Sequence, residues 1–337
     1  MKHASQLATL LIALLVLAAC GPAKDRARFE GRLTNITNAE FYAYTDDGTG
    51  GIDTIRITDG EFTYERQLDH PLLLTLLYPN FTQTYVVLEP GKTVKMKGDA
   101  SKIGEAAITG TPENELLTDF RQRMAASAGR NARIAAADFV RGHATTLSAV
   151  AVFKKHFQHD HDADPRQCLS LLDELHRAQP SSAVVRQMEA SLRPMLQCGK
   201  GQQLPALTAT ATDGRQVNLG SRTGKPVVVV FCASWRGQSL AFLRQARQML
   251  REPGIPAADC IVLSADLDAR NCTEAMKRDS ITWPVVCDGQ AFRSPMVTRL
   301  GLSRVPSCVV ADAQGRITAR DIITPEALRT ALKALKH

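Results

Sequence analysis

The sequence has 337 residues, of which 44% are hydrophobic and 22% are charged, with 22 Gly and 16 Pro. This composition excludes collagen-like, coiled-coil and wholly disordered chains, and the length predicts two or three domains, each large enough to bury a core. The formal net charge is +7, and residues 200–337 hold 19 basic and 11 acidic side chains that are dispersed along the segment. Because nucleic-acid binders usually gather basic residues with interleaved aromatic ones, we expect no nucleic-acid partner.

The first nineteen residues have the pattern of a secretory signal. Lys2 supplies the basic start, an apolar run covers 7–16, and small residues precede Cys20. This run is shorter than the roughly 20 residues that a membrane-spanning helix needs. The tetrapeptide LAAC at 17–20 resembles the lipobox of bacterial lipoproteins, which implies removal of 1–19 and acylation of Cys20, with palmitate among the attached chains. The alternative is an ordinary signal followed by an incidental cysteine.

The lipobox resemblance implies that 20–27 comprise the lipidated Cys20 and a short polar tether to a lipid bilayer. Gly21 follows Cys20 where an Asp would indicate retention at the inner membrane. We therefore expect a cell-envelope protein anchored at the outer membrane and facing the periplasm. An odd number of cysteines remains after Cys20, so at least one thiol is unpaired even in an oxidising compartment. The seven are Cys168, Cys198, Cys232, Cys260, Cys272, Cys287 and Cys308.

Residues 28–110 predict an antiparallel all-β sandwich or barrel. Short segments with partial alternation are separated by turn sequences such as Asp59-Gly60 and Pro90-Gly91. The arrangement from FEGRLTN at 29–35 to ITGTPENELL at 108–117 resembles the poorly characterised β-domain that precedes thioredoxin-like domains in bacterial envelope lipoproteins. That resemblance implies no chemistry. The expected strands are 29–34, 40–45, 54–58, 61–66, 72–78, 84–88 and 93–97.

Residues 111–198 predict a central helical region that links the two domains. Helical periodicity covers 113–126, 132–156, 166–178 and 183–196. The sequence HFQHDHD at 156–162 contains residue types that bind metals. It lies in a polar loop at an expected helix end, without an obvious distant partner, so we interpret it as a solvated helix end and expect no metal.

Residues 199–337 predict an α/β domain. The continuous apolar runs PVVVVFC at 226–232 and DCIVLSA at 259–265 are typical of strands covered on both faces. Strands that alternate with helices predict a sheet with helices on both sides. We expect a hairpin over 207–219, further strands over 285–287, 307–311 and 316–322, and helices over 239–250, 272–279, 292–300 and 325–335.

The run GKPVVVVFCASWRGQSLAFLRQ at 224–245 resembles the active-site strand and helix of membrane-anchored thioredoxin-like oxidoreductases of the TlpA and ResA type. The segments SITWPVVCD at 280–288 and LGLSRVPSCVVADAQGRI at 300–317 resemble later parts of the same family. The resemblance covers most of the domain in order and implies a thioredoxin-like fold. It places Pro306 where thioredoxins have a cis proline.

The active-site positions depart from that family. Thioredoxin chemistry uses two cysteines separated by two residues at a helix start, where the helix lowers the pKa of the first thiol. Aligned through 233–235, those positions are Arg236 and Ser239, with Gly237 and Gln238 between them. Arg carries no thiol and stays protonated, and Ser cannot form a disulfide. We therefore expect no catalytic residue at 236–239.

A binding surface is the interpretation that remains for these positions. A helix N-terminus near 237 offers unpaired backbone N–H groups, Arg236 lies at its start, and Arg304 precedes Pro306 by two residues. An anionic partner would compensate both cations; the alternative is that Arg236 simply points into water. The candidate binding residues are Trp235, Arg236, Gln238, Arg304, Val305 and Pro306.

A redox alternative uses other thiols. Cys232 ends the strand where the family has a tryptophan, and Cys308 lies two residues after Pro306. A disulfide between them is possible if their Cα atoms lie within about 7 Å. Neither thiol has an evident means of becoming a thiolate. Cys168 and Cys198 could form a structural disulfide, while Cys260 and Cys287 are interpreted as packing residues.

The leading functional hypothesis is a lipid-anchored binding or scaffold protein that recognises a peptide or protein partner beside Pro306, without a cofactor and without enzymatic activity. The alternative is a thiol-disulfide oxidoreductase that works through Cys232 or Cys308. A peroxidase-like enzyme is disfavoured, because Arg236 occupies the position where the reactive cysteine would lie.

Overall fold

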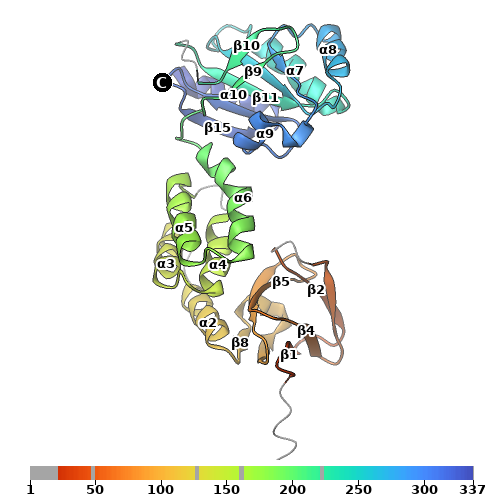
Figure 1. The fold of residues 1–337 in the computed structure, drawn as a ribbon, viewed down its shortest axis with the longest axis vertical. Helices are drawn as coiled ribbons and strands as arrows, with labels where there is room; N and C mark the ends of the chain where they lie inside the picture. Colours follow the sequence, from red (N-terminus) through yellow and green to blue (C-terminus); the bar gives the residue numbers. More distant parts are fainter. Residues whose placement is uncertain (1–21, 47–49, 126–128, 159–162, 221–223, 337) are drawn as a thin grey trace, which may run out of the picture. The chain divides into compact units, whose positions relative to one another are not determined.

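The computed structural model describes residues 22–46, 50–125, 129–158, 163–220 and 224–336 (Figure 1). The predicted signal and Cys20 lie outside these ranges. The chain forms two compact units: the first comprises the chain up to Ala163 with Ser170–Met188, and the second comprises Asp164–Leu169 with Glu189–His337. Among the described residues, none of the helices is long and apolar enough to cross a membrane.

The first unit contains two four-stranded sheets, which include all seven predicted strands. The chain turns from β3 to β4 at Asp59 and Gly60, whose φ angles of 53° and 78° suit a tight hairpin turn. An eighth strand, which the sequence did not indicate, extends the first sheet. The sheet orders are β4-β1-β7-β8 and β3-β2-β5-β6, with β1 Arg26–Thr34, β2 Ala39–Tyr44, β3 Asp53–Ile57, β4 Glu61–Gln67, β5 Leu72–Leu77, β6 Gln83–Leu88, β7 Thr93–Asp99 and β8 Ala107–Thr109.

Alternating side chains from both sheets form one apolar core. Phe62 makes edge-to-face contacts with Phe29 and Phe41, at centroid distances of 4.9 and 5.8 Å. Gly31 is required beside this cluster, since a Cβ there would lie 2.3 Å from the Phe62 ring. Three phenylalanines therefore pack together where the two sheets meet.

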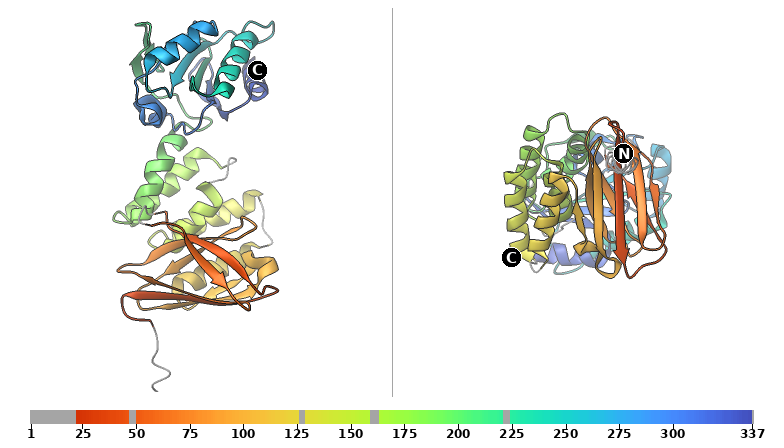
Figure 2. Two further views of the ribbon diagram at one scale, coloured as in Figure 1. Left: turned by 90° about the vertical axis from the view of Figure 1, so that its right-hand side faces the viewer. Right: turned by 90° about the horizontal axis from the view of Figure 1, so that it is seen from below.

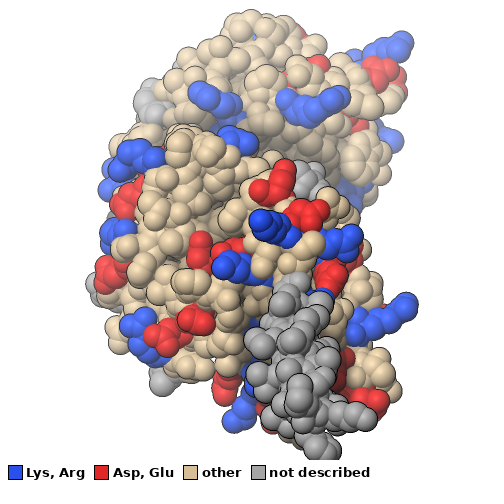
Figure 3. Space-filling view, turned by 60° about the horizontal axis from the view of Figure 1, so that its bottom comes forward, with Lys and Arg blue, Asp and Glu red and all other residues tan. Residues whose placement is uncertain are grey.

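The outer surface of the sheets carries cross-strand ion pairs. Arg28 lies opposite Glu65 in the β1–β4 ladder with its Nη2 at 2.7 Å from Oε1, and Arg56 lies opposite Glu40 in the β2–β3 ladder at 3.1 Å. Basic and acidic side chains are interspersed on the face shown in Figure 3. Exposed ion pairs of this kind contribute about 0–1 kcal/mol each to the stability of the fold. Because of these pairs, few basic side chains of the sheets lack an acidic neighbour.

Helices α2 to α4 lie to one side of the strands (Figures 1 and 2). The predicted continuous helix over 132–156 is wrong, because α3 ends at Gly142 and α4 begins after Thr146, whose Oγ1 accepts a hydrogen bond from the Ala149 N–H at 3.1 Å. Such an N-cap ends one helix and starts another without interrupting the apolar periodicity. The helices are α2 Pro112–Met124, α3 Gly129–Gly142, α4 Leu147–Phe153, a π turn Lys154–Gln158, α5 Pro165–Ala178 and α6 Ala183–Gln197.

Buried polar side chains attach α2 to the sheets. Asn114 is fully buried; its Oδ1 accepts from the Val87 N–H at 3.0 Å and its Nδ2 donates to the Val87 carbonyl at 2.7 Å. Thr118 makes the same pair of bonds with the backbone of Ile108. The helix thus satisfies backbone groups of β6 and β8 as a further strand would. This explains why most of the central helical region groups with the β-domain.

The second unit is an α/β domain built on a five-stranded sheet of order β13-β12-β11-β14-β15. Central β11 runs parallel to β12 and antiparallel to β14. The predicted helix over 292–300 is divided, because Pro295 lacks an N–H and begins a new helix after a single turn. The elements are β9 Thr208–Thr210, β10 Gln216–Asn218, β11 Val227–Cys232, α7 Gly237–Met249, β12 Asp259–Ser264, α8 Ala269–Arg278, β13 Val285–Val286, α9 Pro295–Arg299, β14 Ser307–Ala311, β15 Ile317–Ile322 and α10 Pro325–Lys333.

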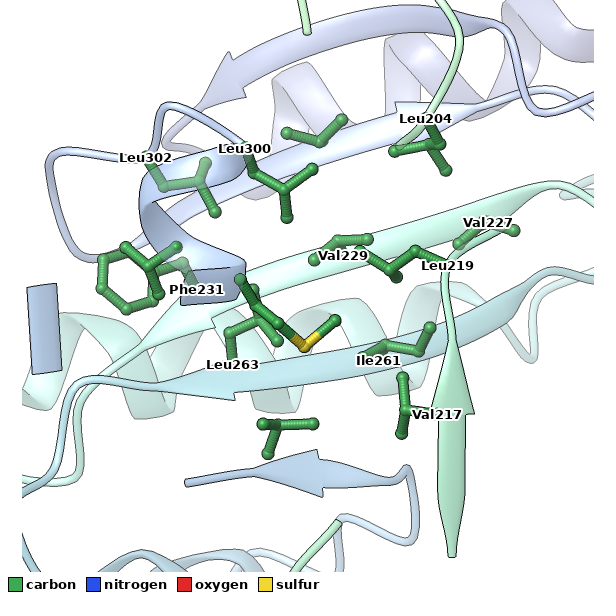
Figure 4. Close-up of a cluster of buried hydrophobic side chains, with 14 of the residues drawn as sticks. Leu204, Val217, Leu219, Val227, Val229, Phe231, Ile261, Leu263, Leu300 and Leu302 are labelled. Atoms are coloured by element: carbon green, nitrogen blue, oxygen red, sulfur yellow. The ribbon is translucent and has the colours of Figure 1, made fainter. Parts of the chain in front are cut away.

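Both faces of β11 are buried, as its continuous apolar sequence predicted. Val227, Val229 and Phe231 pack with the β9–β10 hairpin and α9, and Figure 4 shows Val229 and Phe231 beside Leu263 and Leu300. The alternate residues, ending with Cys232, pack against α7, α8 and α10. The period of two along the strand thus divides the domain core into two layers.

Arg320 on β15 connects the end of α6 to this domain. Its guanidinium donates to the carbonyl oxygens of Met195 and Cys198 at 2.7 and 2.8 Å, and to that of Gly301 at 3.0 Å. The segment around Cys198 is therefore part of the second unit.

Candidate functional site

The start of α7 lies directly after the central strand, at Gly237, which agrees with the predicted helix start. Arg236 is the N-cap residue and makes no side-chain capping bond; its Nη2 instead donates to the Gln238 Oε1 at 3.1 Å. The first turn of α7 contains no acidic residue. An uncapped helix start beside a cation favours an anionic neighbour, because both the N–H groups and the guanidinium are positive.

Most of the predicted binding residues line one groove of about 580 Å³. Arg236 and Gln238 come from the start of α7, and Arg304, Val305 and Pro306 come from the loop before β14. The Val305–Pro306 peptide bond is cis, as the resemblance implied. Trp235 is 63% exposed but does not line this cavity. We call the cavity the α7 groove; it is completed by Ala241, Phe242, Gln245, Ile323, Thr324, Pro325 and Glu326.

The charges of the α7 groove are two arginines and one carboxylate. Neither Arg236 nor Arg304 forms an ion pair with any of the residues that the structure describes. Glu326 is at the start of α10, where it adds a negative charge to that helix terminus. The groove therefore has an excess positive charge that is not neutralised by the fold itself.

A buried carboxylate supports the loop that carries Trp235 and Arg236. Asp266 is 3% exposed and accepts hydrogen bonds from the Ser234 N–H at 3.0 Å and the Ser234 Oγ at 2.6 Å. The Ser264 hydroxyl donates to the same carboxylate. Because each of these groups is satisfied inside the domain, the loop before α7 is held in one conformation.

Two hydroxyl groups next to the groove are buried without a hydrogen-bond partner in the part of the chain that the structure covers. They are the Oγ atoms of Ser239, in the first turn of α7, and of Ser307, directly after Pro306. Ser239 is fully buried and Ser307 is 1% exposed, so neither faces solvent. Ser239 therefore behaves as a packing residue, and the accessible part of the helix start is formed by Arg236 and Gln238.

The cysteines proposed for a redox role are remote from solvent. Cys232 and Cys308 are both 0% exposed, and the β11–β14 register places Cys308 opposite Val230. Burial raises the pKa of the Cys232 thiol well above its ordinary value, with smaller contributions from Cys272 and Asp266, and burial likewise raises the pKa of Cys308. Neither thiol is poised to become a nucleophile.

All seven described cysteines are free thiols. The disulfide between Cys232 and Cys308 and the bridge between Cys168 and Cys198, both left open by the sequence, are therefore not formed in this structure. Cys198 donates to the Arg299 carbonyl at 3.2 Å. Cys260 is a packing residue as expected, at 5% exposure, whereas Cys287 is only partly buried.

No group of His, Cys, Asp or Glu side chains with metal-binding geometry occurs among the described residues. His156 packs edge-on against Phe120 at a centroid distance of 5.8 Å. The rest of the predicted helix-end loop, 159–162, lies outside the described residues.

Sequence reasoning missed about half of the groove. Ala241, Phe242 and Gln245 follow Gln238 at the spacing of one helix face, so the periodicity of α7 could have indicated them. Ile323 and Glu326 come from the junction of β15 and α10. Nothing in that segment has a recognisable motif, and only the folded sheet brings it beside Pro306.

Comparison with protein-family models finds two matches, one in each unit. Residues 28–117 match a domain of unknown function, DUF4369, and residues 199–334 match the Redoxin model. The carboxyl-terminal domain is thioredoxin-like. A comparison with curated proteins finds no match.

Several solved structures similar to the thioredoxin-like domain are described as thiol-disulfide oxidoreductases or thiol:disulfide interchange proteins from bacteria. A thiol-disulfide oxidoreductase from Bacteroides fragilis is 24% identical, with 40% of this chain and 99% of that chain covered and a TM-score of 0.35. A thioredoxin-family thiol:disulfide interchange protein from Chlorobium tepidum is 18% identical over 41% of this chain and 99% of its own, with a TM-score of 0.35. The thioredoxin domain of an oxidoreductase from Bacteroides vulgatus is 17% identical, with coverages of 40% and 98% and a TM-score of 0.34.

Proposed function

We propose that the thioredoxin-like domain is a binding module that holds an extended acidic segment of a peptide or protein partner in the α7 groove. The observation that carries this proposal is the composition of the groove: it joins Arg236 and Arg304, neither paired with a carboxylate among the described residues, and its lining contains no cysteine. The site can attract an anion but offers no thiol to exchange.

An extended chain suits this surface better than a small molecule. The groove lies between a helix start and the loop at Pro306, the region in which thioredoxins hold extended substrates through backbone hydrogen bonds. Ile323 in the groove is 47% exposed, and Trp235, which precedes the groove residue Arg236, is 63% exposed. Apolar side chains are therefore available to contact a partner. Apolar contacts combined with unpaired cations favour a peptide in which acidic and apolar residues alternate.

The match to the Redoxin model favours a second candidate, a thiol-disulfide oxidoreductase or peroxide-reducing protein that uses Cys232 or Cys308. This activity would require a thiol to reach solvent, and both sulfurs are in the buried layer between the sheet and its helices. An insulin-reduction assay discriminates the two candidates. If the wild type reduced insulin and Cys232→Ser or Cys308→Ser abolished that activity, redox chemistry would replace binding as the proposed function.

The binding proposal is tested with fluorescein-labelled peptides of alternating Glu and Val, or of Gln and Val, measured by fluorescence anisotropy. We expect the acidic peptide to bind about tenfold tighter than the neutral one at low salt and to lose that advantage at about 0.5 M salt. Arg236→Ser and Arg304→Gln should each weaken binding of the acidic peptide about fivefold.

These variants are chosen so that misfolding does not imitate lost binding. Ser is a better N-cap residue than Arg, so Arg236→Ser should leave the domain as stable as the wild type or up to about 1 kcal/mol more stable. Arg251→Ser removes an exposed arginine at the other end of α7 and serves as the matched control. Equal affinities for the two peptides, or equal effects of Arg236→Ser and Arg251→Ser, would contradict the proposal.

A further inference from the structure

The first unit contains a partly open cavity of about 540 Å³ that is separate from the α7 groove. Its walls come from strand β6, the single-turn helix Ala100–Glu105, helix α2 and the end of α4 with the π turn after it. Leu117, Phe120 and Val152 give it an apolar lining and are themselves buried. A volume of this size is within the range of small-molecule sites, about 300–1,000 Å³. We call it the α2 cavity.

Arg121 of α2 lines this cavity and has unsatisfied hydrogen-bonding capacity. Its Nη1 donates to the Thr84 Oγ1 at 3.0 Å, and its Nη2 donates to the Ala106 carbonyl at 3.0 Å and the Thr118 Oγ1 at 3.1 Å. All these acceptors are neutral. Its Nε is buried and donates to no acceptor among the described residues. A guanidinium has five N–H donors, so two remain to be satisfied.

A cation in this position is unusual without an anion. Burying a charge is unfavourable unless it is paired, and the described residues supply no carboxylate within ion-pair distance of Arg121. Burial lowers the pKa of Arg121, because the charged guanidinium is less well solvated there than in water. By contrast, the buried Lys154 next to this region pairs with Asp46 and lies 5.8 Å from the Tyr85 ring centroid. Lys154 is thus neutralised by a carboxylate of the same unit, whereas Arg121 faces the cavity without one among the described residues.

Lys155 adds a second positive charge to the lining. It is on the π-helical segment Lys154–Gln158, which lines the cavity. Desolvation by the surrounding protein, with a further contribution from the nearby Arg121, lowers the pKa of its ammonium group. The lining includes one acidic residue, Glu105, for which no ion pair with Arg121 or Lys155 is formed. The cavity therefore combines apolar walls with an excess of positive charge.

We propose that the α2 cavity is a binding site for a small amphipathic anion, in which an apolar body packs against Leu117, Phe120 and Val152 and a carboxylate or related acid group pairs with Arg121 and Lys155. The apolar walls account for affinity, and the unsatisfied guanidinium accounts for selection of an acid. This site belongs to the β-domain and its helices, and it is independent of the function proposed for the α7 groove.

The test uses isothermal titration calorimetry of the purified full-length protein with 2-naphthoate and with 2-naphthamide, which has the same apolar body without the charge. We expect 2-naphthoate to bind with a stoichiometry of one and about tenfold tighter than 2-naphthamide. Inorganic phosphate is the third probe and should compete weakly, because it carries charge without an apolar body. The Arg251→Ser variant should bind 2-naphthoate as the wild type does, since this exposed arginine lines neither the α2 cavity nor the α7 groove.

Three variants assign the binding to this cavity. Lys155→Gln should raise the dissociation constant for 2-naphthoate about fivefold, while Lys97→Gln, an exposed lysine of β7 outside the cavity, should not change it. Gly104→Asp places a carboxylate on the lining at a position where a Cβ meets no atom within 4 Å, and it should also weaken binding. Arg121→Gln should abolish the preference for 2-naphthoate over 2-naphthamide.

Because Arg121→Gln also removes bonds that hold α2, Lys155→Gln and Gly104→Asp decide the result if that variant is unstable. The proposal is overturned by any of three results: no heat of binding for 2-naphthoate at millimolar concentration, equal affinity for the acid and the amide, or unchanged affinity in both Lys155→Gln and Gly104→Asp. Competition by phosphate as strong as that of 2-naphthoate would overturn the amphipathic character of the ligand.

Discussion

Arg236 is placed where it contributes little to the stability of its own helix. Ser, Thr, Asp and Asn are the residues that cap helix N-termini well, and a cation there opposes the helix dipole. Among the other described helices, Thr111, Asp268 and Thr324 each accept a hydrogen bond from the first turn that follows, whereas Ser294 before α9 makes no side-chain capping bond. The cation at the start of α7 coincides with the lining of a groove, which is where a binding role would justify a residue that does not stabilise the fold.

The buried thiols of the thioredoxin-like domain predict how its stability depends on pH. Burial, more than the nearby Asp259, raises the pKa of Cys260 to about 12, and burial is also the main cause that raises the pKa of Cys272 to about 12. Since the folded pKa values exceed those of unfolded thiols, this contribution to stability is complete below about pH 9 and is lost as the pH rises towards 12. At pH 10 the loss should be about 1–2 kcal/mol for each thiol, because an unfolded thiol ionises with a pKa near 9.0.

The measurement is the urea midpoint of the domain at about pH 8, 9 and 10, followed by tryptophan fluorescence. Both tryptophans, Trp235 and Trp283, are in the second unit, so the signal reports this domain alone. Cys260→Ala should show a shallower decline above pH 9 than the wild type, whatever its midpoint at pH 8. Parallel curves for the two proteins would show that Cys260 ionises in the folded state as freely as in the unfolded one.

At the level of single residues, sequence reasoning found the groove where a motif marks it and missed the α2 cavity entirely. Arg236 and Pro306 belong to segments whose order along the chain is characteristic of one fold, so their proximity could be expected. Arg121 and Lys155 are 34 positions apart in helices without a motif. Their convergence depends on the packing of α2 against α4 and the sheets, which hydrophobic periodicity does not specify.

Helices and strands were predicted well where periodicity and turn residues agree, as in the seven strands of the β-domain and the continuous apolar β11. Errors occurred where one local contact overrides the pattern. Thr146 divides a periodic stretch by capping α4, and Pro295 starts α9 inside an expected helix. The attachment of α2 by Asn114 was not predictable either, because a polar residue on a helix face gives no sign that it will bond the backbone of a strand.

The position of α7 directly after β11 predicts that dithiol chemistry can be introduced there. In the double variant Arg236→Cys/Ser239→Cys, two thiols three residues apart would lie at the helix start, where the dipole lowers the pKa of the first one. Ser239 is buried with an unbonded hydroxyl, so a thiol can replace it without loss of a hydrogen bond. We expect insulin reduction in the presence of dithiothreitol by the double variant.

Wild type and the single variant Arg236→Cys are the controls for that experiment. The single variant should accumulate a mixed disulfide with substrate, because it has no second thiol to release it. A wild type as active as the double variant would contradict the view that residues 236–239 lack redox function. An inactive, folded double variant would show instead that the helix start does not activate a thiol.

At the scale of the whole molecule, the two units present different kinds of site. The first unit has a partly open cavity lined by apolar residues and two cations, and the second has a groove with two arginines. Each site also contains one carboxylate, Glu105 or Glu326, but among the described residues neither forms an ion pair with the cations of its site, whereas on the sheets cations are paired with acids across strands. The excess positive charge of each site is the feature on which both binding proposals depend.

The predicted lipid anchor would determine where these sites operate. Cys20 lies outside the described residues, and the proposal of an acylated Cys20 rests on the sequence LAAC at 17–20. One acyl chain gives only marginal membrane binding, whereas two or more give stable anchoring. Cys20→Ala should therefore move the protein from the membrane fraction to the soluble fraction and remove the mass of the acyl groups from the amino-terminal peptide.

Cys168→Ala is the matched control for Cys20→Ala, since it removes a buried cysteine of the folded region and should leave the protein in the membrane fraction. Gly21→Asp supplies the residue that indicates retention at the inner membrane and should shift the protein from the outer to the inner membrane in a density gradient. If the Cys20→Ala protein stayed with membranes through a high-salt wash, the anchor would not be this cysteine. A wild type found in the soluble fraction would contradict the proposed anchor.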